Sequence, residues 1–130
     1  MIYLSDIRDF LKTVFKAEHY YICKLDNKQD KSLGVYSLKQ SGAPVRAIGD
    51  ESTYNTISVS LLLHWNNNAN ETERQARNLF ETLYSVKDVE INKHTIYIIE
   101  LLTPEPVDVG TDDKGVYEQV IEVKFYYERK

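Results

Sequence analysis

Residues 54–65 constrain the fold most, because apolar and polar side chains alternate along them over the length of a long strand. Successive side chains of a strand point to opposite faces of its sheet. One face of this strand is therefore expected in the core, and the other is expected to be only partly covered. The core-facing set comprises Ile57, Val59, Leu61, Leu63 and Trp65.

Two other segments repeat apolar residues with the period of a helix. In residues 5–16, Ser5 stands at the expected N-cap, and the stripe consists of Ile7, Phe10, Leu11, Val14 and Phe15. In residues 71–85, Asn70 and Glu73 have the spacing of a capping box. The stripe of this second helix is expected to bury Ala76, Leu79, Phe80, Leu83 and Tyr84.

Further strands are predicted on both sides of these elements. Residues 20–25 and 33–38 flank a polar turn and are interpreted as a hairpin. Residues 89–102 form a strand that can split near Asn92 and Lys93, and residues 116–128 form the last strand. Between them, residues 103–115 are expected to be a long loop that ends in a tight return, and a loop of this length is often functional.

The order of these elements is helix, strands, helix, strands. No helix follows each strand in turn, which argues against a doubly wound parallel sheet. We therefore predict an α+β fold, with a mostly antiparallel sheet and two amphipathic helices packed on one face. The 130 residues are enough for one hydrophobic core, and residues 1–130 are expected to form a single domain.

The charge balance narrows the classes of partner. The chain has 16 Lys and Arg against 20 Asp and Glu, and no segment is dense in basic residues. Direct sequence-specific binding of nucleic acid is therefore not expected. No apolar run is long enough to cross a membrane, and the N-terminus lacks the pattern of a secretory signal. The ten tyrosines suit half-buried strands and protein interfaces.

No catalytic or metal-binding constellation stands out. His19, His64 and His94 lack ligand spacing, and the single Cys23 is interpreted as a small core residue in a strand. The aspartates of residues 108–113 do not have the spacing of an EF-type calcium loop. No glycine-rich phosphate loop and no nucleophile elbow are present. We therefore expect no cofactor, no metal and no enzymatic activity.

The closing part of the chain carries a resemblance to a known family. Pro104-Glu105-Pro106 precedes the turn of residues 110–117, and an alternating strand then runs through Phe125-Tyr126-Tyr127-Glu128. Residues 58–65, leading into residues 70–84, match the middle of the same pattern. In this order of elements the chain resembles the tail-terminator and minor capsid proteins of long-tailed bacteriophages, over nearly its whole length.

This resemblance implies a structural role in the virion, without enzymatic activity. Members of the family form rings, commonly six-fold, that cap the tail tube at the head–tail junction. The implied partners are further copies of this chain, in a hexamer, together with the tail tube protein and the head connector protein. The implied locations are the virion and, during assembly, the cytoplasm of the host bacterium.

Assembly contacts are expected in two polar loops, residues 49–53 and 107–115. The candidate interface residues are Asp50, Glu51, Val109, Asp112, Asp113 and Lys114. Residues 1–40 carry 7 basic and 5 acidic groups and residues 41–130 carry 9 and 15, a bias that would suit head-to-tail contacts.

Two other functions remain open at this point. One is a small dimeric adaptor with a single tight partner. The other is a small ligand-binding or hydrolytic α+β domain that uses His64, Asp50 or Glu51 in a cleft.

Overall fold

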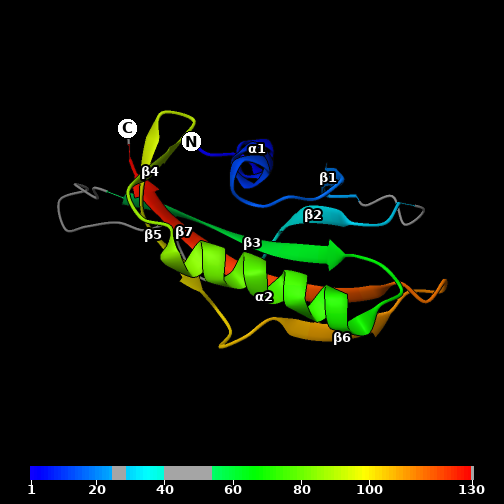
Figure 1. Cartoon of the computed structure of the whole chain (residues 1–130). Coiled ribbons are helices and arrows are strands. Elements are labelled where there is room, and N and C mark those ends of the chain that lie inside the picture. Colours follow the sequence, from blue (N-terminus) through cyan, green and yellow to red (C-terminus); the bar gives the residue numbers. More distant parts are fainter. Residues whose placement is uncertain (25–28, 40–53, 130) are drawn as a thin grey trace.

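The computed structural model describes residues 1–24, 29–39 and 54–129, which form two helices and a seven-stranded sheet (Figure 1). The fold is α+β and the sheet is mostly antiparallel, as predicted. The elements in chain order are α1 (Leu4–Val14), β1 (His19–Ile22), β2 (Ser32–Ser37), β3 (Tyr54–His64), α2 (Ala69–Ser85), β4 (Val89–Ile91), β5 (His94–Leu101), β6 (Val107–Thr111) and β7 (Tyr117–Glu128).

The long strands β3 and β7 form the centre of the sheet. They pair antiparallel without interruption, from Tyr54 opposite Glu128 to His64 opposite Glu118. The sheet runs in the order β1-β2-β3-β7-β5-β4, and β6 pairs with β7 beside β5. The outer edge of β7 is thus shared: β5 pairs with its C-terminal half and β6 with its N-terminal half.

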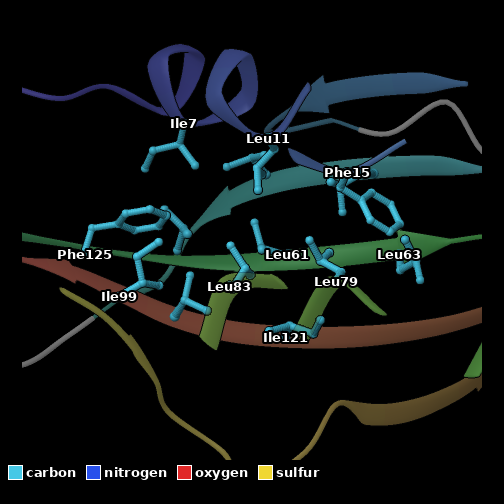
Figure 2. Close-up of a cluster of buried hydrophobic side chains, with 14 of the residues drawn as sticks. Ile7, Leu11, Phe15, Leu61, Leu63, Leu79, Leu83, Ile99, Ile121 and Phe125 are labelled. Carbon is cyan, nitrogen blue, oxygen red and sulfur yellow. The ribbon is translucent and has the colours of Figure 1, made fainter. Parts of the chain in front are cut away.

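Both helices pack on the same face of this sheet. Ile7 and Leu11 of α1 meet Leu79 and Leu83 of α2 in one buried cluster (Figure 2). The alternation of residues 54–65 explains the floor of this cluster, because Val59, Leu61, Leu63 and Trp65 are all buried. From β7 the cluster receives Ile121, Val123, Phe125 and Tyr127.

The first two strands do not form the expected hairpin. β1 and β2 pair in parallel, with His19 opposite Ser32 and Ile22 opposite Val35. The chain therefore returns to the start of β1 before β2 begins. The backbone amides of Glu18 and His19 donate to the carbonyl of Lys31, which fixes this return.

Cys23 is also not the core residue that the sequence suggested. It lies just beyond the end of β1, is exposed, and has a φ of 60°. A left-handed residue cannot continue a strand, so the chain leaves the sheet here and the side chain reaches solvent.

Both helices begin earlier than expected. α1 starts at Leu4, because the Asp6 carboxylate accepts a hydrogen bond from the Tyr3 amide at 2.9 Å, and Ser5 is inside the helix. α2 starts at Ala69, because the Asn68 side chain accepts from the Glu71 amide at 3.1 Å. The capping residue is Asn68 rather than Asn70.

The segment 89–102 splits where the sequence suggested, whereas the segment 103–115 does not remain a loop. Asn92 and Lys93 have φ values of 47° and 66°, which fit a two-residue hairpin turn between β4 and β5. Residues 107–111 form β6, which was expected to be irregular. Every residue of β6 is exposed, so the short alternation of Val107, Asp108 and Val109 does not mark a buried face.

The core packing of α2 predicts a sharp difference between two neighbouring residues. Leu83 is fully buried, whereas Tyr84 is 71% exposed and is not part of the buried stripe expected for it. Leu83→Ala should lower the free energy of unfolding by about 2–5 kcal/mol, and Tyr84→Ala should change it by less than about 0.5 kcal/mol. Urea denaturation of the two variants measures both values, and equal losses would contradict the observed rotation of α2.

Candidate functional site

The candidate site is the projection made by β6 and the turn after it, residues 107–116, which we call the arm. Its first half is a bulged edge strand, because the pairing register with β7 shifts between Asp108 and Gly110. The Asp108 carboxylate accepts a hydrogen bond from the Gly110 amide at 2.8 Å, and Gly110 has a φ of 87° that suits glycine. The bulge leaves Val107 and Val109 exposed to solvent.

The tip of the arm is a turn built around Asp112. One oxygen of its carboxylate accepts from the amides of Lys114 and Val116, both at 2.9 Å. The Asp112 amide donates to the Val116 carbonyl at 3.0 Å, and Gly115 supplies a φ of 81°. The tight return predicted for residues 113–115 is therefore present, and Asp112 organises it.

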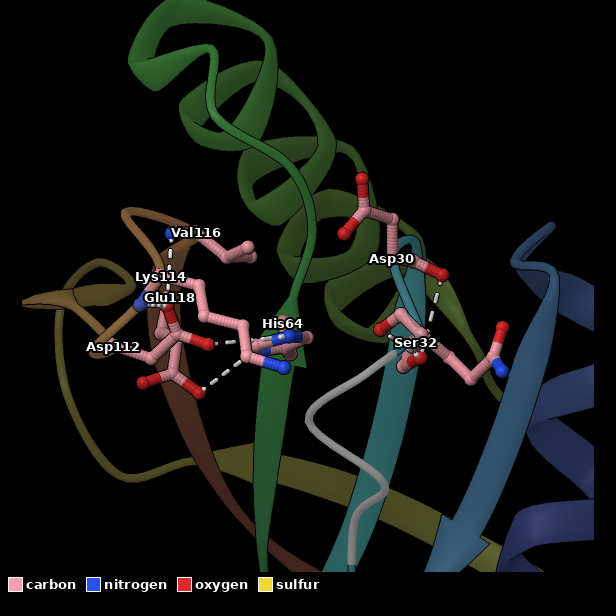
Figure 3. A network of polar contacts seen from close by, with 8 residues as sticks. Asp30, Ser32, His64, Asp112, Lys114, Val116 and Glu118 are labelled. Atoms are coloured by element: carbon pink, nitrogen blue, oxygen red, sulfur yellow. Dashed lines mark hydrogen bonds and ion pairs between the residues drawn. The ribbon is translucent and has the colours of Figure 1, made fainter.

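His64 holds this turn against the sheet (Figure 3). It ends β3 on the face away from the helices, yet its side chain is completely buried. Its Nδ1 lies 3.0 Å from Oε2 of Glu118, and its Nε2 lies 3.7 Å from Oδ2 of Asp112. A protonated His64 would direct one N–H toward each carboxylate. We call these three residues the His64 cluster.

The charge and the hydrogen bonds of the His64 cluster shape the ionisation of Asp112. Burial by itself raises the pKa of the Asp112 carboxyl. The amides of Val116 and Lys114, with the charges of His64 and Lys114, outweigh that effect and hold the pKa below its ordinary value of 3.8. Asp112 is therefore a stable anion within the turn.

The contacts of the His64 cluster account for how the arm is held against the sheet. The two ring nitrogens face different carboxylates and do not converge on one point, as ligands of a single metal would. No group of three or more His, Cys, Asp or Glu suited to a metal ion occurs in the described part of the chain. The cluster contains no hydroxyl or thiol nucleophile.

A groove among the described residues lies beside the arm rather than at His64. It has a volume of about 530 Å³ and runs between α2 and residues 103–108. Arg77 crosses it, 3.4 Å from Glu105 and 3.5 Å from Glu73. His64 is not among the residues that line this groove.

The predicted interface residues fall into three groups. Val109, Asp113 and Lys114 are exposed on the arm. Asp112 is directed inward, with a side chain that is only 14% exposed. Asp50 and Glu51 lie outside the described residues. The contact of His64 with Glu118 was not predicted, although antiparallel pairing of the two long alternating strands places the two residues opposite each other.

A family model described as bacteriophage tail terminator protein matches residues 4–129. The chain belongs to this family. It is a structural protein of a phage tail, and as a tail terminator it is a component of the virion that interacts with other virion proteins.

The resemblance drawn from the order of elements is thereby confirmed. No curated protein matches the chain. Among the described residues of this tail terminator, neither helix has the length and apolar character needed to cross a bilayer.

The lowered pKa of Asp112 predicts a pH-dependent contribution to stability. Because the folded pKa lies below the unfolded one, the ionised carboxylate stabilises the fold above about pH 4, and this contribution disappears as the pH falls through the folded pKa. Asp112→Asn keeps an oxygen for the two amides but loses the charge beside His64. Its free energy of unfolding should be lower than that of the wild type at pH 7, and this difference should become smaller below about pH 4.

Chemical denaturation at a series of pH values measures this difference. Asp113→Asn removes the same charge from an exposed neighbour and should stay within about 0.5 kcal/mol of wild type throughout. A difference for Asp112→Asn that stays constant down to pH 2 would contradict the assignment.

Proposed function

We propose that this chain caps the phage tail tube as a ring of identical subunits and joins the tube to the head connector. The match to the tail terminator family over residues 4–129 carries the proposal. Six subunits are proposed, in keeping with the rings that the resemblance implies. Assembly in the cytoplasm of the host bacterium is part of the same proposal.

The shape of the subunit supports a ring in physical terms. A ring requires two different surfaces on each subunit that fit one another. The sheet has two unlike edges: the short parallel strand β1 forms one, and β4 together with β6 of the arm forms the other. Val107 and Val109 of the arm are 42% and 50% exposed, and a contact with a neighbouring subunit would bury the rest of their apolar surface.

The exposed arm residues Val109, Asp113 and Lys114 are proposed to contact neighbouring virion proteins. Asp112 has a different proposed role: it shapes the turn that presents Asp113 and Lys114. A variant at Asp112 would therefore change both folding and assembly, and it cannot report on an interface alone.

Electron microscopy of a lysate from the phage lacking this gene tests the proposed function. Filled heads beside separate, over-long tails are expected, because an uncapped tube continues to grow. Tails of normal length beside unjoined heads would place the chain on the connector side instead. Intact infectious particles would overturn the proposal in favour of a small adaptor.

A second prediction concerns the tip of the arm. Asp113→Ala with Lys114→Ala should leave the unfolding transition within about 0.5 kcal/mol of wild type, because both side chains are exposed. The yield of infectious particles in a complementation assay should fall. Arg74→Ala with Glu81→Ala removes one charge of each sign from the exposed face of α2 and serves as the control. Equal yields from both double variants would remove the tip from the proposed interface.

A further inference from the structure

We propose that neighbouring subunits join through β-strand pairing, with β6 of one copy adding to the outer edge of β1 of the next. This inference rests on the ring proposed above and specifies its subunit contact. The occupant of each edge is thus a second copy of this chain. Four features of the described residues carry the inference. They are the matching positions of β1 and β6 along the sheet, their opposite strand directions, their outward-pointing backbone groups, and the side chains and charges beside them.

The two edge strands lie at the same level of the sheet. Val107 pairs with Val120, which pairs with Leu62. Leu62 pairs with Gly34, and Gly34 pairs with Tyr21 of β1. Val107 and Tyr21 therefore occupy one row at opposite edges. β1 and β6 have four and five residues, so they can pair along their full lengths.

The strand directions make the junction antiparallel. β1 runs parallel to β2, whereas each later step across the sheet, from β2 to β3, β7 and β6, is antiparallel. β1 and β6 therefore run in opposite directions within one subunit. When the next subunit continues the sheet sideways in the same orientation, its β1 lies antiparallel to β6. The parallel pairing of β1 with β2, which the sequence did not reveal, produces this polarity.

Each strand directs backbone groups away from its own sheet. His19 and Cys23 donate inward to Lys31 and Val35, so by alternation the amides of Tyr20 and Ile22 point outward. On β7, Tyr117 bonds to Asn66 and Trp65, and Val120 therefore faces β6 and its partner Val107. Asp108 consequently directs its backbone groups outward. An edge of this kind is a template for another strand.

The side chains at the two edges are complementary. Val107 lies on the face away from the helices, as does Tyr21, whose ring stacks on His19. Pairing the edges would bring the exposed valine against this aromatic pair, a favourable cross-strand contact. The exposed charges near β1 are Lys16, Glu18 and Lys24, and those near β6 are Glu105, Asp108, Asp113 and Lys114, so β1 carries a basic excess and β6 an acidic one.

Cysteine cross-linking tests the pairing directly. In one subunit the two edges are separated by four strand spacings, roughly 19 Å, which no disulfide can bridge. The test variant carries Tyr21→Cys and Val107→Cys in a Cys23→Ser background, and a second version has Val109→Cys in place of Val107→Cys. Mild oxidation of assembled rings should give a ladder of linked subunits up to the full ring. Each single-cysteine control can form nothing larger than a dimer.

A proline substitution tests the backbone contact independently. Asp108→Pro removes an outward amide without removing a bond to β7, and proline is tolerated at such an edge. Asp108→Pro and Asp108→Ala both lose the carboxylate that accepts from the Gly110 amide. The two variants therefore differ in the backbone amide of residue 108, which only the alanine variant keeps. Asp108→Pro should weaken each subunit junction by roughly tenfold relative to Asp108→Ala, measured by mass photometry or sedimentation, with the thermal transition of both monomers retained.

The outcomes separate this inference from the proposed function. Rings that form on tails, without a ladder from either double-cysteine variant, would overturn the strand pairing and leave the ring intact. Equal assembly of Asp108→Pro and Asp108→Ala would likewise overturn it. A wild-type chain that stays monomeric even on tails from the deletion lysate would overturn both proposals. A ladder together with weakened Asp108→Pro rings supports both.

Discussion

The uninterrupted pairing of β3 with β7 is the contact on which the rest of the molecule depends. Its helix-facing rows form the floor of the core, where Leu61 and Ile121 meet both helices. Its opposite face brings His64 beside Glu118 and so provides the anchor for the arm. β7 is also longer than either strand at its outer edge, which leaves room for both β5 and β6. The register between β3 and β7 therefore determines the floor of the core, the contact of His64 with Glu118 and the positions of β5 and β6.

The sequence predicted most of the buried side chains where one side of an element faces the core. Alternation from Ile57 to Trp65 and the helical stripes predicted the buried faces, apart from the exposed Tyr84, because burial imposes a period on apolar residues. The split at Asn92 and Lys93 was also predicted, because residues that tolerate positive φ are typical of hairpin turns. The family was reached from the order of these same elements, which the match to residues 4–129 confirms.

The features that were not predicted depend on contacts between distant parts of the chain, which leave no pattern in the local sequence. A hairpin and a parallel return have the same sequence signature, so the direction of β2 relative to β1 was predicted wrongly. β6 is exposed at every residue, and its alternation of Val and Asp over three residues is too short to separate a strand from a loop. The inward contacts of Asp112 require His64, which is distant in sequence and meets it only after β3 and β7 have paired. The helix starts differ by one or two residues because several polar side chains there can act as caps.

The His64 cluster has a consequence for how this family member can change over evolutionary time. Each of the three side chains neutralises or orients another in a site with little access to water. Replacing one alone leaves a largely buried polar atom without its partner, which is costly in such surroundings. Drift at these positions is therefore expected to proceed through compensating replacements. In an alignment of relatives, the three columns should vary together while the exposed Asp113 varies independently.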